Sequence, residues 1–309
     1  MANLPRMRYA VTGAAGFIGS HLAERLLAAG HEVVGLDCFT DYYDPALKEE
    51  NARPLDVRRV DLAEDALDLA GFDGVFHLAG QPGVRSFGDV FPNYLRHNVL
   101  ASQRVFEAAA RDGVRTVYAS SSSIYGAAGR YPTPEDTPPQ PLSPYGITKL
   151  TAEHLAAAYT REFGLDCVVL RYFNAFGPRQ RPDMAFTRIV FDLADGRPFD
   201  LYGDGEQSRG WTYVQDVVDA TVLAMQGGRG TYNVGGALEA TMNESIALLE
   251  RISGRRLDVR RQPPVPGDQR RTSADTTRIR SELGWRPRVS LEEGLAAQWE
   301  WASARVAAG

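Results

Sequence analysis

The stretch TGAAGFIGSHL, residues 12–22, decides the fold of this chain. It places Gly13, Gly16 and Gly19 directly after a short apolar run and at the start of an amphipathic one. Three glycines at this spacing can also form a simple turn. The strand pattern before them and the helix pattern after them favour a dinucleotide-binding loop. In that context the first glycine allows a sharp exit from the strand and the second lets backbone approach a pyrophosphate. The third lets the helix pack closely while its first N–H groups face the anion.

Short apolar runs alternate with longer amphipathic ones through the first half of the chain, as in parallel strands joined by helical crossovers. Ile18, Leu22 and Leu26 share one helix face before Gly30, and residues 98–110 repeat the helical period. Such crossovers are right-handed, so we expect an α/β fold with a Rossmann-type doubly wound parallel sheet. The expected strands are Arg8–Thr12, Glu32–Leu36, Val57–Val60, Gly74–Ala79, Thr116–Ser120 and Asp166–Arg171.

The composition of the sequence changes after about residue 172, where Gly and Pro become frequent in GPRQRP, DGRP and PPVPG. We therefore expect residues 1–172 to form the dinucleotide-binding domain and residues 173–309 a smaller, mainly substrate-binding α/β lobe. A helix near residues 214–225 is expected to return to the first sheet within a segment near 210–235.

Composition and charge restrict the function. The 309 residues carry a formal net charge of −5, and the arginine-rich stretches are interspersed with prolines and acids, which disfavours a nucleic-acid partner. No run reaches the length of a membrane span. The two cysteines, Cys38 and Cys167, lie far apart and fit no metal-binding spacing, so we expect no metal and a reducing cytoplasmic location.

Asp37 ends the second expected strand, 18 residues after Gly19. A carboxylate there can accept both ribose hydroxyls of adenosine and repels the extra phosphate of NADP. No Lys or Arg follows within residues 38–40, so NAD is the expected cofactor. Asp61 and Leu62 follow the third strand and are expected at the adenine edge, although an Asp there can equally be a helix cap.

The stretches YASSSSIYG, residues 118–126, and SPYGITK, residues 143–149, together with the phosphate loop, resemble the extended short-chain dehydrogenase/reductase family. Within it the chain is most similar to nucleotide-sugar epimerases and dehydratases. The resemblance implies catalytic roles for Ser121, Tyr145 and Lys149. It further implies that the cofactor contacts Phe17, Ile18, Leu78, Ala79, Gly80 and Asn98.

The chemistry of hydride removal explains the Tyr–Lys pair. Oxidation of a sugar alcohol needs a base for the hydroxyl proton, and a free tyrosine is too weakly ionised at neutral pH. Tyr145 and Lys149 are four residues apart on one helix face. An ammonium at about 4 Å contributes roughly 4 kcal/mol at intermediate dielectric, so we expect the tyrosine pKa to fall to near 7. Ser121 would bond the same substrate oxygen.

Ser122 and Ser123 bear on the type of reaction. Related sugar-nucleotide dehydratases carry Asp and Glu at these two positions, and decarboxylases carry Glu at the second. Two serines lack an acid to protonate a leaving hydroxide, which disfavours elimination. Oxidation at carbon 4, rotation of the keto sugar and hydride return then give epimerisation of a UDP-sugar.

The later segments indicate the substrate. By resemblance, Asn174 and Arg209 bind the nucleotide diphosphate, and Asp268 and Arg271 lie near the uridine ribose. The stretches DYYDPALKEENA, AGQPGVRSF and RPDM resemble UDP-glucuronate 4-epimerases, in which Arg181 or Arg85 would clamp the sugar carboxylate through two hydrogen bonds.

Three alternatives stay open from the sequence. The first is a UDP-glucose or UDP-N-acetylglucosamine 4-epimerase, which shares the catalytic residues. The others are a UDP-glucuronate decarboxylase and a non-catalytic NAD-binding regulatory protein. A homodimer through the helices Asn93–Ala110 and Tyr145–Phe163 is expected from the family.

Overall fold

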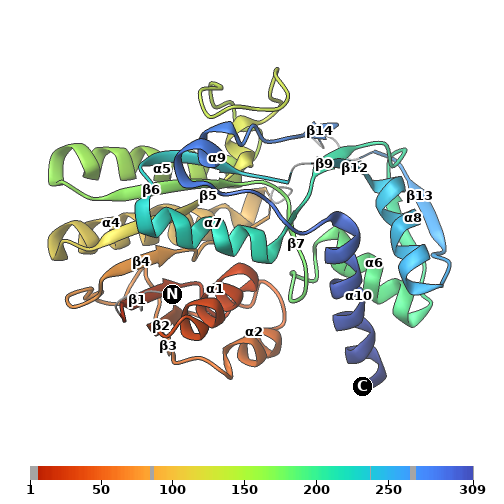
Figure 1. The fold of residues 1–309 in the computed structure, drawn as a ribbon, viewed down its shortest axis with the longest axis horizontal. Coiled ribbons are helices and arrows are strands. Elements are labelled where there is room, and N and C mark those ends of the chain that lie inside the picture. The colour runs from red at the N-terminus through yellow and green to blue at the C-terminus, as the bar shows by residue number, and fades with distance from the viewer. Residues whose placement is uncertain (1–5, 84–86, 237, 265–268, 309) are drawn as a thin grey trace.

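A computed structural model describes residues 6–83, 87–236, 238–264 and 269–308. Its centre is a seven-stranded parallel sheet in the order β11-β6-β5-β4-β1-β2-β3 (Figure 1). The strands are β1 (Arg8–Thr12), β2 (Glu32–Asp37), β3 (Val57–Arg59), β4 (Gly74–His77), β5 (Arg115–Ser121), β6 (Cys167–Tyr172) and β11 (Gly230–Val234). The doubly wound fold predicted from the sequence is confirmed, and the six expected strands occur within two residues of their expected ends.

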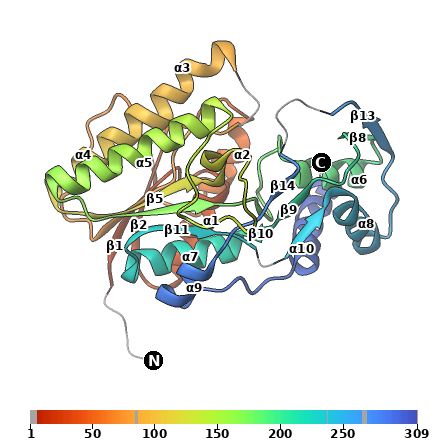
Figure 2. The same cartoon turned by 90° about the horizontal axis from the view of Figure 1, so that it is seen from above.

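Helices cover both faces of this sheet. On one face lie α1 (Phe17–Ala28), α7 (Val214–Gly227) and α9 (Thr277–Leu283); on the other lie α4 (Ala101–Asp112) and α5 (Pro144–Phe163) (Figure 2). Because both faces are covered, the central strands are buried along nearly their whole length, as in β5. This explains why β2 (EVVGLD) and β6 (CVVLRY) contain runs of consecutive apolar residues rather than an alternating pattern.

The helix expected over residues 93–110 is one continuous helical segment with a local change of winding. It comprises η1 (Gly88–Val90), α3 (Phe91–Tyr94), the π-helical turn η2 (Leu95–Leu100) and then α4. Asn98 points inward from the π turn and is fully buried. π turns inside helices re-aim side chains and are frequent at functional sites, which fits the contacts of Asn98 described below.

The seventh strand, β11, was not predicted from the sequence. It follows α7 and pairs in parallel with β6, so α7 covers the large sheet and β11 extends it, although both lie within the second half of the chain. Val217, Val218 and Ala220 of α7 are buried in the same core as Leu22 and Leu26 of α1.

The smaller lobe has a separate apolar core built from α6 (Ala185–Asp195), α8 (Met242–Ser253) and α10 (Leu291–Ala308). Short strands complete the lobe and its connections: β7 (Ala175–Phe176) with β10 (Thr212–Tyr213), β8 (Phe199–Tyr202) with β13 (Val259–Gln262), and β9 (Ser208–Gly210) between β12 (Glu239–Thr241) and β14 (Arg271–Thr272). Two further elements, α2 (Pro45–Ala52) and η3 (Ser122–Tyr125), border the candidate site.

The loop at residues 177–184 connects the two lobes. His21 of α1 hydrogen-bonds the carbonyl of Pro178 at 3.0 Å, and Arg179 forms an ion pair with Glu24 at 2.8 Å. On the other side, buried Gln180 accepts a hydrogen bond from Gln298 of α10 at 3.0 Å. The loop is thus held from both lobes. Among the described residues, no helix has the length and apolar character needed to cross a membrane.

Candidate active site

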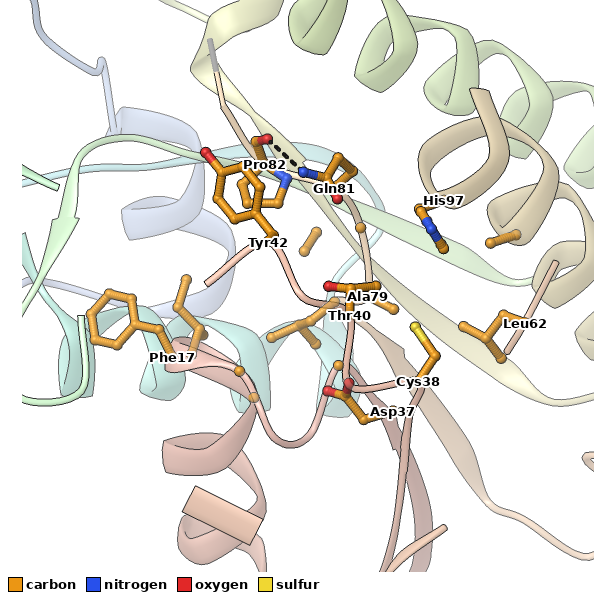
Figure 3. A pocket seen from close by; sticks show the side chains of 18 of the residues that line it. Phe17, Asp37, Cys38, Thr40, Tyr42, Leu62, Ala79, Gln81, Pro82 and His97 are labelled. Atoms are coloured by element: carbon orange, nitrogen blue, oxygen red, sulfur yellow. Dashed lines mark hydrogen bonds between the residues drawn. The ribbon is translucent and has the colours of Figure 1, made fainter. Parts of the chain in front are cut away.

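A cavity lies at the carboxyl ends of β1, β2, β4 and β5, where doubly wound sheets bind ligands. Figure 3 shows Asp37 and Cys38 on one wall, with Leu62 and His97 to one side and Tyr42, Gln81 and Pro82 opposite. The lining includes most residues expected to contact the cofactor: Gly13, Gly16, Phe17, Ile18, Gly19, Asp37, Leu62, Leu78, Ala79, Gly80, Tyr145 and Lys149.

The glycines of the phosphate loop leave no room for side chains. Gly13 has a φ of 71°, and a Cβ atom there would lie 2.9 Å from the backbone nitrogen of Ala79. At Gly19 a Cβ would lie 2.1 Å from the carbonyl oxygen of Gly13. The loop therefore wraps back on itself and exposes backbone N–H groups at the start of α1, the arrangement that binds a pyrophosphate.

Asp37 is held by backbone donors at the end of β2. Its carboxylate accepts from the N–H of Ala15 at 3.1 Å and from that of Phe39 at 2.8 Å. Phe39 has a φ of 53°, so the chain turns sharply after the acid. The carboxylate faces the cavity with its orientation fixed, as a ribose-binding acid requires.

Two residues expected to contact the cofactor lie behind the lining. Asp61 forms an ion pair with Arg96 at 2.7 Å, and its Oδ1 accepts from the N–H of Ala63, which is a turn-capping role. Asn98 bonds both backbone groups of Gln81, its Oδ1 accepting at 2.7 Å and its Nδ2 donating at 3.0 Å. Asn98 thus positions the loop after β4, which itself lines the cavity.

The structure brings Ser121, at the carboxyl end of β5, together with Tyr145 and Lys149, near the start of α5. Lys149 is buried, and its ammonium donates to the carbonyl of Ala119 at 2.8 Å. Burial lowers the pKa of Lys149 to about 8, and Glu153 opposes that fall. The Ser121 hydroxyl accepts from the backbone N–H of Ser123 at 3.1 Å, so its position is fixed where the strand ends.

The expected lowering of the Tyr145 pKa is wrong for this structure. Desolvation raises the pKa of Tyr145, while hydrogen bonding to Ser121 and the charge of Arg181 lower it by less. The ammonium of Lys149 lies 6.0 Å from the Tyr145 ring centroid and is engaged by the Ala119 carbonyl. The spacing of four residues gives a common helix face, but it does not bring the two polar ends into contact.

The sequence reasoning missed a buried network behind Lys149. Glu153, one helical turn further along α5, forms an ion pair with Arg171 of β6 at 2.8 Å and accepts from Ser120 at 2.5 Å. Arg171 in turn donates to Tyr125 at 2.7 Å. The network links β5, β6 and η3, and it places a carboxylate near the ammonium of Lys149. Lysine and glutamate four residues apart on a helix are the signal that could have revealed it.

Ser122 and Ser123 begin η3. The Ser121 hydroxyl donates to Ser123 at 3.1 Å. Among the described residues that line the cavity, Asp37 is the single carboxylate, and it lies at the cofactor end. No acid near Tyr145 is therefore present in the described lining to protonate a leaving hydroxide.

The residues expected to bind the nucleotide lie in the smaller lobe and around its connections. Asn174 donates to Thr272 at 2.6 Å, and Arg209 donates to the carbonyl of Ser208 at 2.9 Å. Arg271 forms a two-point ion pair with Glu239. Arg85 and Asp268 lie outside the described residues.

Arg181 lines the cavity but already has a partner. Its Nε and one Nη donate to the two carboxylate oxygens of Asp183, each at 3.0 Å, and Tyr42 donates to the same carboxylate at 3.3 Å. These bonds use two of the five N–H donors of the guanidinium. The N–H groups left on its two Nη atoms can still hold a second carboxylate at two points, although the charge of Asp183 would oppose that contact.

These features define a class: a Rossmann-fold, dinucleotide-dependent enzyme with a serine, tyrosine and lysine beside the cofactor pocket. The family model described as NAD dependent epimerase/dehydratase matches residues 9–235, and the chain belongs to that family. The pocket fits its cofactor, NAD, because the glycine loop and the Asp37 carboxylate provide the pyrophosphate and ribose contacts.

Similar proteins match over nearly the whole chain. The chain is 42% identical to the "Uncharacterized UDP-glucose epimerase YtcB" of Bacillus subtilis, covering 94% of this chain and 96% of that protein. It is 40% identical to the UDP-glucose 4-epimerase of Mycolicibacterium smegmatis, covering 96% and 98%. The crystal structure of the UDP-glucuronic acid 4-epimerase of Bacillus cereus with UDP-glucuronic acid and NAD superposes with a TM-score of 0.93, at 38% identity over 97% and 100%.

Proposed function

We propose that this enzyme is a UDP-sugar 4-epimerase that interconverts UDP-glucuronate and UDP-galacturonate. The observation that carries the choice of sugar is Arg181, a cation that lines the cavity and whose charge opposes part of the rise in the Tyr145 pKa. An arginine beside the reacting carbon suits a carboxylate at the neighbouring carbon 5 position. The similarity to the Bacillus cereus enzyme bound to UDP-glucuronic acid supports this choice.

The residues of the chain divide the work of the reaction. When bound, NAD would supply the hydride acceptor for the oxidation at carbon 4, and its positive charge would favour the ionised form of the phenol. Tyr145 takes the proton of the carbon 4 hydroxyl and returns it after the keto sugar has rotated in the site. Ser121 hydrogen-bonds the same oxygen. Lys149 supplies positive charge at the site and is held in place by the carbonyl of Ala119.

The same geometry protects the oxidised sugar from side reactions. A 4-keto sugar with a carboxylate on carbon 5 is a β-keto acid, which loses carbon dioxide when the carboxyl bond stands perpendicular to the carbonyl plane. A hydrogen bond from Arg181 would hold the carboxylate away from that alignment. Elimination of water is disfavoured because Ser122 and Ser123 offer no acid.

A UDP-glucose 4-epimerase is the second candidate. The relative at 40% identity carries that name, and the relative at 42% identity is named an uncharacterized UDP-glucose epimerase. The pairing of Arg181 with Asp183 also supports it, because a guanidinium already neutralised is a poorer partner for a sugar carboxylate. The catalytic residues are the same in both candidates, so the sugar has to be determined by experiment.

The test is to incubate the purified protein with UDP-glucuronate, UDP-glucose and UDP-N-acetylglucosamine separately and to identify the products by anion-exchange chromatography and NMR. We expect UDP-galacturonate as the main product, with the highest kcat/KM on UDP-glucuronate. Formation of UDP-xylose alone, or turnover of UDP-glucose with none of UDP-glucuronate, would reject the proposal.

A matched pair of variants tests the role of Arg181. Arg181→Leu should lower kcat/KM for UDP-glucuronate by roughly 100-fold, since a charged hydrogen bond is worth about 1.5–3 kcal/mol. Its effect on UDP-glucose should be smaller. Arg188, which lies on α6 with its guanidinium over the Phe199 ring, provides the control Arg188→Leu and should leave both values unchanged.

We also propose a homodimer in which the helical segment of residues 91–112 and α5 pack against the same elements of a second copy. Apolar side chains are exposed along them, with Leu95 46% exposed, Leu100 45% and Ile147 48%. A four-helix contact between two copies would bury these side chains. Light scattering after size-exclusion chromatography should give twice the chain mass, and Ile147→Glu should give the single-chain mass. A wild-type protein of single-chain mass would contradict the dimer.

A further inference from the structure

Lysine is almost absent from this chain. Of 34 lysines and arginines, two are lysines, Lys48 and Lys149, and all other cationic side chains of this kind are arginines. Both lysines are buried, at 6% and 4% exposure, and both line the same cavity. Lys149 takes part in the reaction. Lys48 lines the cofactor end of the cavity and has no part in the reaction.

Lys48 reaches the cavity from α2, which follows the loop after Asp37. Asp44 caps this helix by accepting from the N–H of Ala46 at 2.9 Å, and the side chain of Lys48 turns back under the loop. Its ammonium donates to the carbonyl oxygen of Thr40 at 2.6 Å and to the Thr40 hydroxyl at 2.8 Å. Since an ammonium has three N–H groups, one is left beyond these two bonds.

The surroundings of Lys48 place it at the adenosine end of the pocket. Desolvation lowers its pKa, while the charges of Asp37, Cys38 and Asp41 raise it, so the carboxylate expected to hold the ribose acts directly on this ammonium. The charge of Lys48 also contributes to lowering the pKa of His97, which lines the same cavity.

The Lys48 ammonium can offset negative charge in the occupied pocket. The cofactor brings a pyrophosphate next to the Asp37 carboxylate, and like charges in a partly buried pocket repel. Among the described lining residues the cations are Lys48, Lys149 and Arg181. The second of these is engaged at the reacting end, and Arg181 is paired with Asp183.

We infer that Lys48 is a further cofactor-binding residue. It offers the N–H that is not bonded to Thr40 to an oxygen of the adenosine half of the dinucleotide, offsets part of the negative charge there, and anchors the loop of residues 39–47 over that half. The Tyr43 ring, whose centroid lies 4.7 Å from the ammonium, packs on the same group. The sequence showed no basic residue at the three positions after Asp37, and Lys48 comes to the same cavity from further along the chain. The inference rests on NAD binding and is independent of which UDP-sugar is the substrate.

The affinity for cofactor fragments provides the test. Dissociation constants for NAD, ADP-ribose and nicotinamide mononucleotide are measured by equilibrium dialysis on protein depleted of nucleotide. We expect Lys48→Met to weaken NAD and ADP-ribose by about 10- to 100-fold, the range of one charge-assisted hydrogen bond. Nicotinamide mononucleotide should be unaffected, and Lys48→Arg should be intermediate. The control is Arg53→Met, which removes an exposed cation at the end of the same helix.

A purely structural role for Lys48 would be revealed by salt. Loss of a charge contact makes the dissociation constant of the variant less sensitive to NaCl than that of the wild type, because screening acts on one interaction fewer. Equal salt dependence, or equal affinity for ADP-ribose in Lys48→Met and the wild type, would overturn the inference.

The wild-type protein permits a second measurement that does not depend on the variant folding. Because the chain has two lysines, amine acetylation followed by mass spectrometry reports on each one separately. ADP-ribose, which lacks the nicotinamide, should slow the acetylation of Lys48 at least several-fold. Unchanged acetylation of Lys48 at saturating ADP-ribose would contradict the proposed contact.

Discussion

The buried histidine at the end of β4 makes the stability of this enzyme depend on pH. His77 is fully buried between β1 and α4, with Nδ1 2.8 Å from the Thr12 hydroxyl and Nε2 2.9 Å from the Ser102 hydroxyl. Thr12 Oγ1 already accepts from the N–H groups of Leu78 and Ala79, each at 3.1 Å. The Thr12 proton is therefore free to go to Nδ1, and Nε2 carries the ring proton. A second ring proton would face an oxygen that has no accepting position left.

The magnitude follows from the shifted pKa. Desolvation, with a smaller effect of Lys149, lowers the pKa of His77 from 6.5 to about 3. Since the folded pKa lies below the unfolded one, the contribution is complete above pH 6.5 and is lost as pH falls toward 3. Between pH 7.5 and pH 5 the His77 imidazole becomes protonated in the unfolded chain but stays neutral in the folded protein. This difference lowers the free energy of unfolding by about 2 kcal/mol.

The assay is urea-induced unfolding at pH 7.5 and pH 5 for the wild type and His77→Gln. We expect the variant to be less stable at pH 7.5, because two buried hydroxyls lose their partner. The decrease in its free energy of unfolding from pH 7.5 to pH 5 should be about 2 kcal/mol smaller than the decrease in the wild type. The exposed His154 on α5 supplies the control His154→Gln. Equal losses in the wild type and His77→Gln would refute the reasoning.

Two further substitutions test the cofactor loop and the network behind the active site. Gly19→Ala places a Cβ 2.1 Å from the Gly13 carbonyl oxygen, so we expect the NAD dissociation constant to rise at least about 10-fold and the free energy of unfolding to fall by roughly 1–3 kcal/mol. An unchanged dissociation constant would contradict that packing. Glu153→Gln removes the carboxylate that raises the pKa of Lys149, so the alkaline limb of the kcat/KM profile should move to lower pH. Its control is the exposed Glu162→Gln on the same helix, and identical profiles would exclude this influence.

The parts of the structure that could be predicted from sequence are those set by local patterns. The phosphate loop and the strand ends follow from glycine positions and periodicity, which depend on short-range sterics. The helix that carries Tyr145 and Lys149 was expected from the family resemblance of residues 143–149. Strand β11 was missed because its five residues, Gly230–Val234, lie in a glycine-rich stretch and gain their stability from pairing with β6.

Features that depend on long-range packing could not be predicted. Lys48 lies 11 residues beyond Asp37, and it reaches the same pocket because α2 folds back over the loop. The pairing of Arg181 with Asp183 is a choice among several acids that the sequence does not rank. The raised pKa of Tyr145 reflects desolvation, a property of the surrounding fold rather than of its neighbours in sequence.

The role of Tyr145 as the base is the central claim, and replacing its hydroxyl tests it most directly. The measurement is the rate of UDP-sugar interconversion by Tyr145→Phe protein that is shown to be folded and to retain NAD. A Tyr202→Phe control removes an exposed phenol in the smaller lobe. We predict a loss of about 10²- to 10⁴-fold in kcat for Tyr145→Phe, the usual range for general acid–base catalysis, and none for the control. A Tyr145→Phe enzyme that epimerises its substrate at the wild-type rate would contradict the account.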